Sequence, residues 1–175
     1  MAAGLREPSS VTTAWAGKYL SVEIESWPGL DDYETVRKHD AVVIVPLTPS
    51  NEVVLVRQFR PPVRDSLLEV PAGLLDVDGE DALTCAGREL WEETGYRHRL
   101  MSFMGGTYLS PGFTGEYVHL FWAETEAEPS GPVEDGIEVV LIPFVRAVAH
   151  ARAGKVRNAA TALALLLADA QIPGA

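Results

Sequence analysis

Three carboxylates crowd one short stretch of the sequence, at Glu89, Glu92 and Glu93. The apolar residues from Asp81 to Thr94 recur with a helical period, so the three glutamates are predicted to lie on one helix. Spacings of three and four residues place their side chains at neighbouring positions of the same face. Clustered carboxylates with no histidine or thiol among them favour a hard, oxygen-preferring ion. The segment therefore predicts a Mg²⁺ site, with Mn²⁺ as a substitute.

The same stretch is unfavourable as plain helix surface. Like charges at this spacing repel by roughly 0.2–0.5 kcal/mol per pair. They also lie near the C-terminal end of the helix, which Gly95 is expected to mark and where the helix dipole favours cations. Arg88 offsets only part of this cost, and local penalties gathered at one place are typical of a functional site. The alternative is a solvated acidic face that binds nothing.

The composition narrows the class of partner. The 175 residues suit a single folded domain with a short N-terminal addition. Twenty-five acidic and 14 basic residues give a net charge of −11 at pH 7, which argues against a nucleic-acid partner. An acidic protein that handles phosphates would need metal ions as intermediaries, although the charge could equally serve solubility alone.

Three features of the sequence indicate the cytoplasm and no membrane partner. No apolar run reaches the roughly 18 residues that a membrane span needs. Residues 1–14 lack the apolar core of a signal peptide. The single cysteine, Cys85, excludes an intrachain disulfide and a multi-cysteine zinc site.

Alternating apolar residues and turn residues predict strands on both sides of the acidic helix and two helices at the end of the chain. Residues 1–13 are polar and small and are expected to be poorly ordered. The predicted strands are Lys18–Ser26, Tyr33–Arg37, Ala41–Leu47, Val53–Phe59, Leu67–Val70, Leu100–Tyr108, Glu116–Ala123 and Ile137–Pro143, and the predicted helices are Asp81–Thr94, Val145–Ala153 and Asn158–Ala170. This order predicts an α+β fold with a mixed sheet flanked by helices.

The acidic helix and the residues before it resemble the signature of the Nudix hydrolase family. The matching residues are Gly73, Glu80 and the run Arg88–Tyr96, which reads Arg-Glu-Leu-Trp-Glu-Glu-Thr-Gly-Tyr. Six residues separate Gly73 from Glu80, where the common pattern has five, and the spacing from Glu80 onward is that of the family. The resemblance implies a strand–loop–helix–loop motif within an α/β/α sandwich.

The resemblance also implies roles for the acidic residues. Glu89 and Glu93 look like the principal metal ligands, with Glu92 nearby and the carbonyl of Ala72 as a further ligand. Arg88 looks like the residue that orients the ligating carboxylates, as an outer partner should. Glu92 and Arg88 are accordingly expected to take part in catalysis.

Three flanking segments resemble the ADP-ribose pyrophosphatase subgroup of the family, namely Arg57–Pro62, Glu69–Asp76 and Ser110–Glu116. The implied reaction is the hydrolysis of ADP-ribose to AMP and ribose 5-phosphate. Two alternatives stay open. One is a hydrolase of another nucleoside diphosphate sugar, such as GDP-mannose, and the other is a non-catalytic Nudix-like domain that binds a nucleotide as a sensor. The intact acidic residues favour an enzyme, because a binding module would not need them.

The substrate is expected to contact residues outside the acidic helix. Arg60 resembles the arginine that grips a phosphate or the terminal ribose, a task that suits a planar guanidinium, and Arg57 is a second candidate. A surface role at the strand end is the alternative for Arg60. The resemblance assigns Pro111 and Gly112 to substrate binding and Glu116 to the catalytic base or to positioning it. The alternative for Glu116 is an exposed glutamate at the start of a strand.

Residues 1–37 are predicted to form an N-terminal appendage, a strand hairpin that precedes a Nudix domain at residues 38–175. Members of the resembled subgroup are homodimers whose N-terminal strands cross between subunits, so this chain is predicted to form a homodimer. Tyr33, followed by Glu34, matches the aromatic residue that stacks on adenine in those dimers. Other aromatic platforms, or core residues, are Trp15 and Trp27.

Overall fold

The fold is given by a computed structural model that describes residues 7–172, so residues 1–6 of the segment expected to be poorly ordered, and residues 173–175 of the predicted domain, lie outside the described chain. In chain order the elements are β1 (Ser10–Ala16), β2 (Ser21–Ser26), β3 (Tyr33–Arg37), β4 (Ala41–Leu47), β5 (Glu52–Arg60), the 3₁₀ turn η1 (Pro61–Val63), β6 (Asp65–Glu69), β7 (Ala72–Leu74), α1 (Ala82–Thr94), β8 (His98–Tyr108), β9 (Tyr117–Thr125), β10 (Ile137–Pro143), α2 (Phe144–Arg152) and α3 (Ala159–Gln171). None of the helices in the described chain is long and apolar enough to cross a membrane.

Seven strands form the main sheet, whose central strand is β4. The sheet order is β10-β5-β4-β9-β8, with β6 alongside β5 and β7 alongside β4. Strand β4 runs parallel to β9 and antiparallel to β5 and β7, so the sheet is mixed. All seven residues of β4 are buried, as expected for an apolar strand that is covered on both faces.

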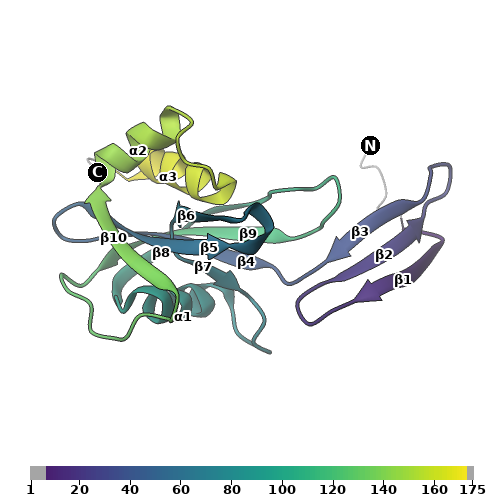
Figure 1. Ribbon diagram of the computed structural model, residues 1–175, viewed down its shortest axis with the longest axis horizontal. Helices are drawn as coiled ribbons and strands as arrows, with labels where there is room; N and C mark the ends of the chain where they lie inside the picture. Colours follow the sequence, from purple (N-terminus) through teal and green to yellow (C-terminus); the bar gives the residue numbers. More distant parts are fainter. Residues whose placement is uncertain (1–6, 173–175) are drawn as a thin grey trace.

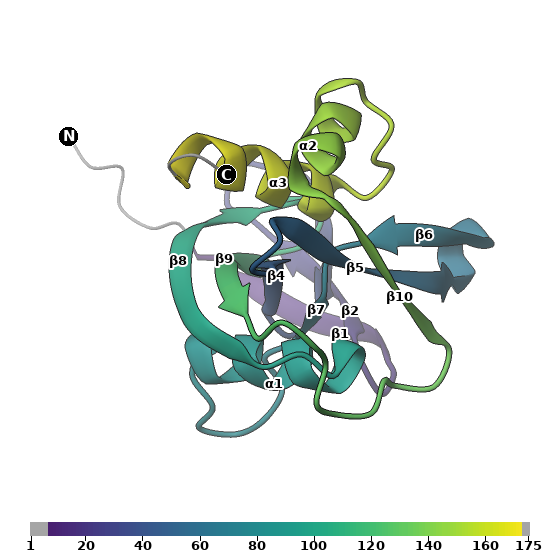
Figure 2. The ribbon, with the colours of Figure 1, turned by 90° about the vertical axis from the view of Figure 1, so that its left-hand side faces the viewer.

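Helices cover both faces of this sheet, with α1 on one side and α2 and α3 on the other (Figures 1 and 2). Val42 and Ile44 of β4 pack with Leu90 of α1 in one hydrophobic cluster, whereas Val43 and Val45 pack with α2 and α3 in a second cluster. Successive side chains of a strand point to opposite faces, and this alternation divides the core into two layers. The predicted α+β class, with helices on both sides of a mixed sheet, is confirmed.

A separate sheet of three strands, β1-β2-β3, extends from one side of the main body (Figure 1). Strand β1 begins at Ser10, so the expectation of poor order is wrong for residues 10–13, and the predicted hairpin has a third strand. Every residue of β1 is exposed, so the strand is not held by burial in a core. Its order comes from antiparallel pairing with β2, which starts at Ser21 instead of Lys18.

The segment around the signature contains a short strand that the sequence pattern missed. Pro71 interrupts the chain after β6, and Ala72–Leu74 then pairs with β4 as strand β7. Helix α1 follows, capped by the carboxylate of Asp81, which accepts a hydrogen bond from the N–H of Thr84 at 2.9 Å. The helix ends at Gly95, whose φ of 72° suits glycine. Helix α1 ends at Thr94, as the sequence predicts, and begins at Ala82, one residue after the predicted start at Asp81.

Candidate metal and diphosphate site

Helix α1 presents its charged residues beside β7 because its opposite face is anchored in the core. Cys85, Ala86 and Leu90 are fully buried against the sheet. Arg88 and Glu89 lie beside this buried face on the helix surface and are partly buried. The predicted cluster of carboxylates is therefore carried by a rigid helix whose orientation is fixed by packing.

Arg88 binds three carboxylates at once. Its Nε and Nη2 donate to the two oxygens of Glu80 at 2.9 and 2.8 Å, and its Nη1 donates to Glu89 at 2.6 Å and to Glu92 at 3.1 Å. The fork-to-fork contact with Arg88 lowers the pKa of Glu80, and the same contact raises the pKa of Arg88. The longer loop before Glu80 thus still delivers this carboxylate to Arg88. Such contacts are what a residue that orients Glu89 and Glu92 requires.

The carboxylates of Glu93 and Glu89 are shielded from solvent. Glu93 is 5% exposed and accepts a hydrogen bond from the N–H of Ala72 at 3.0 Å. Burial raises the pKa of Glu93 from 4.5 to about 8; the Ala72 N–H opposes this shift and the charge of Glu89 adds to it. Burial also raises the pKa of Glu89, against the opposing charge of Arg88. A nearby cation would favour the charged form of both groups.

Gly73 leaves the space that the Glu89 carboxyl group occupies. A Cβ atom added at Gly73 would lie 1.9 Å from Cδ of Glu89, far inside van der Waals contact. The glycine of the signature therefore lets the backbone of β7 and the helix carboxylate approach each other closely. This cradle and the all-oxygen donors around it fit a hard divalent ion.

The carboxylates of the described chain do not converge on a single point. Within residues 7–172, no group of three or more His, Cys, Asp or Glu side chains could hold an ion as it stands. Glu89 and Glu92 are turned toward Arg88, and Glu93 is turned toward the N–H of Ala72. Binding of an ion by these residues would require their carboxyl groups to rotate away from those partners.

Arg60 lies near this cluster and is held by a buried glutamate. Its Nε and Nη2 donate to Oε2 of Glu69 at 3.0 and 2.5 Å, and Glu69 is 2% exposed. The other oxygen of Glu69 accepts a hydrogen bond from Nδ2 of Asn158 at 2.7 Å, and Asn158 also caps the N-terminus of α3. The charge of Arg60 acts to lower the pKa of Glu93, so the two side chains share one electrostatic environment.

Arg57 is not brought together with Arg60. The two residues are three apart on β5, and side chains at odd spacing point to opposite faces of a strand. Arg57 donates from Nε to Glu138 at 3.0 Å and borders a cavity on the α2–α3 side of the sheet. The alternation of side chains along a strand is therefore enough to predict that Arg57 and Arg60 lie on opposite faces of the sheet.

The loop that carries Pro111, Gly112 and Glu116 is attached to the N-terminal sheet. The N–H of Val36 in β3 donates to the carbonyl of Phe113 at 2.7 Å, and Glu116 forms an ion pair with Lys38 at 2.7 Å. This loop and β3 therefore form one junction between the small sheet and the main body. In this structure Glu116 is bound to Lys38 rather than free.

The aromatic candidates differ in their surroundings. Tyr33 is 48% exposed on β3, next to the exposed Glu34, and is open to a partner. Trp27 is partly buried and donates from Nε1 to the buried Glu25, which favours a structural role within the small sheet. Trp15 is 56% exposed on β1.

Glu134 is a site residue that the sequence reading missed. Its charge acts to raise the pKa of Glu93, and its N–H donates to the carbonyl of Glu92 at 3.1 Å. The loop between β9 and β10 therefore lies against the C-terminal end of α1. Glu134 stands far from the signature in sequence and in no fixed spacing to it, so only the fold reveals the proximity.

Comparison with known proteins assigns the family. The model of the NUDIX domain matches residues 37–164. The chain therefore belongs to the NUDIX family, and the predicted membership is confirmed. Proteins of this family generally use a divalent metal ion.

The relatives carry several names. A methanol dehydrogenase activator of Bacillus methanolicus is 43% identical over 91 residues, which cover 52% of this chain and 49% of that protein. An ADP-ribose pyrophosphatase of Bacillus subtilis is 34% identical over 75% of this chain and 73% of its own length. A GDP-mannose pyrophosphatase of Yersinia enterocolitica is 36% identical over 79% and 76%, respectively. A crystal structure of an ADP compounds hydrolase has a TM-score of 0.81 at 23% identity, covers 95% of both chains and shows the shared fold.

Proposed function

We propose that the chain is a Mg²⁺-dependent diphosphatase that hydrolyses ADP-ribose to AMP and ribose 5-phosphate. The observation that carries this proposal is the position of two carboxylates beside β7: Glu89 lies against Gly73, and the buried Glu93 accepts the N–H of Ala72 with the charge of Arg60 nearby. The relative named an ADP-ribose pyrophosphatase, which aligns with three quarters of the chain, supports the same substrate.

The residues of the cluster divide the work. Glu89, Glu92 and Glu93, together with the carbonyl of Ala72, would hold the ion. Arg88 contacts the first two carboxylates and would hold them beside the site until they turn to the ion. When bound, the ion would neutralise diphosphate oxygens and lower the pKa of a bound water. We assign Arg60 to a phosphate or the terminal ribose, because Glu69 fixes its guanidinium and leaves one terminal nitrogen, Nη1, free of that carboxylate.

A carboxylate must accept the proton of the attacking water. The water oxygen forms a bond to one phosphorus, the bridging phosphorus–oxygen bond breaks, and the proton passes to the base. Glu116 is the base in our proposal, and it must first leave Lys38, a movement that its loop with two glycines and a proline would permit. Glu134 is the competing candidate because its charge already reaches Glu93.

The rest of the substrate would contact the junction between the two sheets. Tyr33 would stack on the adenine with Glu34 beside it, and the loop at Pro111 and Gly112 would close over the sugar–phosphate part. The hydrogen bond from the N–H of Val36 to the carbonyl of Phe113 supports this arrangement, because it links β3 to the loop that carries Pro111 and Gly112.

GDP-mannose is the second candidate substrate, because the relative named for it aligns over 79% of the chain at 36% identity. A sensor without catalysis is disfavoured. Burying the carboxylates of Glu89 and Glu93 destabilises the fold, and a module that only binds a nucleotide would not need them.

The test is a panel of ADP-ribose, GDP-mannose and other nucleoside diphosphate sugars, incubated with Mg²⁺ and followed by product identification. We expect ADP-ribose to give the highest kcat/KM and the products AMP and ribose 5-phosphate. Glu93→Gln serves as the matched inactive control. A higher kcat/KM for GDP-mannose would show that the assignment of ADP-ribose as the substrate is wrong. Tight binding of a nucleotide sugar with no turnover would show that the chain is a sensor and not an enzyme.

We further propose that the active form is a homodimer built on the three-stranded sheet. Within a short N-terminal stretch, the exposed large apolar side chains are Val11, Trp15, Tyr19, Leu20, Ile24, Leu30 and Tyr33. A small sheet with so much exposed apolar surface is stabilised when a partner covers it. A second copy would also bring its own Tyr33 toward the site. The cytoplasmic location predicted from the sequence stays a prediction.

A further inference from the structure

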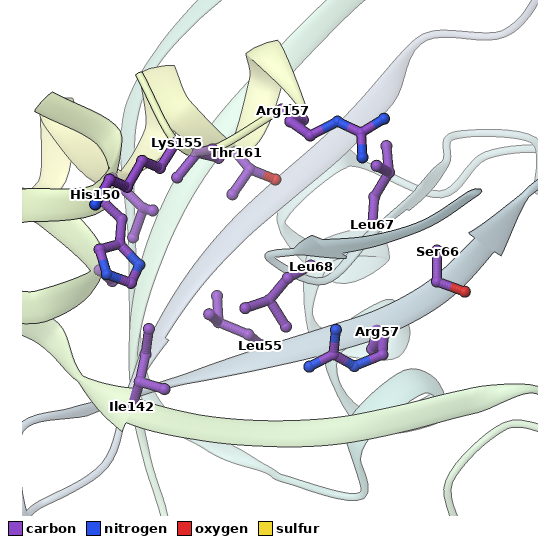
Figure 3. A pocket seen from close by; sticks show the side chains of 13 residues that line it. Leu55, Arg57, Ser66, Leu67, Leu68, Ile142, His150, Lys155, Arg157 and Thr161 are labelled. Carbon is purple, nitrogen blue, oxygen red and sulfur yellow. The ribbon is translucent and has the colours of Figure 1, made fainter. Parts of the chain in front are cut away.

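The cavity that Arg57 borders lies on the side of the main sheet that α2 and α3 cover (Figure 3). It has a volume of about 210 Å³ and is enclosed by β5, β6, the end of β10 and the turn between α2 and α3. Leu55 and Leu68 form its apolar floor, and Ile142 closes one end. Leu55 belongs to the hydrophobic cluster of α2 and α3, whereas α1 packs on the opposite face. The sheet therefore separates this cavity from the acidic helix.

The rim of the cavity is basic, in a chain whose net charge is −11. Arg57, His150, Lys155 and Arg157 line it, and no aspartate or glutamate is among its lining residues within 7–172. In Figure 3 the labelled His150 and Lys155 lie toward the helices at one end, and Arg57 and Arg157 lie toward the other. A chain with 25 acidic and 14 basic residues would give a random pocket more negative than positive groups. The lining itself is therefore basic, and the carboxylates that pair with Arg57 and Arg157 lie outside it, so Lys155 is the cation of the rim that no carboxylate compensates within residues 7–172.

Several of these cationic groups retain free donors. Arg157 donates from Nη1 to Asp65 at 2.6 Å, and Arg57 donates from Nε to Glu138 at 3.0 Å, which leaves the other guanidinium nitrogens available. Lys155 has no ion-pair partner in the part of the chain that the structure describes. An unpaired cation beside an apolar floor is suited to an anionic group whose remaining atoms are apolar.

We propose that this cavity binds a small organic anion, with its apolar body against Leu55 and Leu68 and its carboxylate or phosphate at the turn between α2 and α3, which carries both Lys155 and Arg157. Inorganic phosphate would leave the apolar floor uncovered. A dinucleotide-sized molecule is too large, since pockets for drug-sized ligands measure roughly 300–1,000 Å³. This site is independent of the diphosphate site, so the proposal does not rest on the proposed function.

The test uses the full chain freed of divalent ions by a chelator, titrated with phenyl phosphate and with benzoate and followed by calorimetry or amide NMR shifts. We expect at least one of these anions to bind with a Kd of about 1 mM or lower, and inorganic phosphate and phenol to bind at least about tenfold more weakly. Binding of phenyl phosphate alone identifies a phosphate ligand, and binding of benzoate alone identifies a carboxylate ligand. The absence of binding by both anions at about 10 mM would overturn the proposal.

Substitutions of residues that line the cavity test whether the anion binds there. Lys155→Gln and Arg157→Gln should each weaken the affinity at least about fivefold. Arg146→Gln is the matched control, because Arg146 is exposed on α2 and does not line the cavity. Arg157→Gln also removes the contact with Asp65, so circular dichroism must show that it folds; Lys155→Gln removes no ion pair and stands as the cleaner variant. Unchanged affinity in Lys155→Gln, or displacement of the anion by ADP-ribose in competition, would refute the site.

Discussion

Replacing Glu93 with glutamine should stabilise the metal-free protein and abolish its activity. The side chain is 5% exposed, and burial raises the pKa of Glu93 from 4.5 to about 8. Glutamine has nearly the same shape, and its amide oxygen can still accept the Ala72 N–H that Glu93 accepts at 3.0 Å. The substitution therefore removes the cost of ionising a buried carboxyl group and leaves the packing in place.

The sign of the pH dependence follows from the direction of the shift. Because the folded-state pKa of Glu93 is raised, its favourable contribution is complete below pH 4.5 and is lost as the pH rises toward about 8. Each pKa unit corresponds to about 1.36 kcal/mol, and roughly 2.5 units separate 4.5 from pH 7. The wild-type protein thus loses on the order of 3 kcal/mol between acidic pH and pH 7, and Glu93→Gln should not. For a chain of this size the gain corresponds to roughly 6–12 °C in Tm.

Thermal unfolding in a chelator between about pH 5 and pH 8 measures this difference. We expect the Tm of Glu93→Gln to exceed that of the wild type at pH 7 and the gap to close near about pH 5. Glu92→Gln is the matched control, because it removes the same charge from an exposed position of the same helix and should not reproduce the pH-dependent gain. A gap that is independent of pH would show that Glu93 does not titrate as its burial requires.

Mg²⁺ provides the second half of the test. The ion should raise the Tm of the wild type and have little effect on Glu93→Gln, because a ligand that binds only the folded state stabilises it. Turnover of ADP-ribose should fall by about a hundredfold or more in the variant. Equal stabilisation of both proteins by Mg²⁺, or near-normal turnover at saturating Mg²⁺, would exclude Glu93 as a ligand.

Three further predictions concern the site and the assembly. Gly73→Ala should reduce kcat at least about tenfold with the fold intact, because the new Cβ would displace the carboxyl group of Glu89; full activity would contradict the cradle. Glu116→Gln should lower kcat strongly and leave the KM for ADP-ribose nearly unchanged, while Glu134→Gln keeps most activity; the reverse result would make Glu134 the base. Sedimentation should give a dimer at micromolar concentration, with Trp15→Ser shifting it toward monomer; a monomeric wild type would reject the dimer and the adenine role of the appendage.

The parts of the fold that were predictable are those in which local residues determine local structure. Helix α1 begins after Asp81 and ends at Gly95 because a carboxylate cap and a left-handed glycine act within one turn of the chain. Strand β4 is apolar along its whole length and is buried on both faces in the centre of the sheet. In each case the sequence contains the complete physical cause.

The missed strands show the opposite case. Strand β1 has no buried side chain, so it is held by its pairing with β2 and not by contact with a core. Strand β7 has three residues after Pro71 and exists because β4 offers it a hydrogen-bonding edge. Both depend on a partner strand, and no window of sequence around the segment contains that information.

The candidate site divides in the same way. Arg88, Glu89, Glu92 and Glu93 were found because one helix carries them, and a helix fixes their spacing. Glu134 was missed because a distant loop brings it to the end of α1. The opposite directions of the two β5 arginines follow from the strand period, because residues three apart on a strand point to opposite faces.

The charge balance around α1 links the protonation of Glu93 to the binding of an ion. The four carboxylates of Glu80, Glu89, Glu92 and Glu93 face one strong cation, Arg88, which binds the first three. Glu93 is not among the partners of Arg88 within residues 7–172, and burial raises the pKa of Glu93 to about 8, so that a proton can neutralise it near pH 7. A divalent ion that takes the place of this proton would also draw Glu89 and Glu92 away from Arg88. Ion binding, proton release and the reorientation of Arg88 are therefore expected to occur as one coupled event.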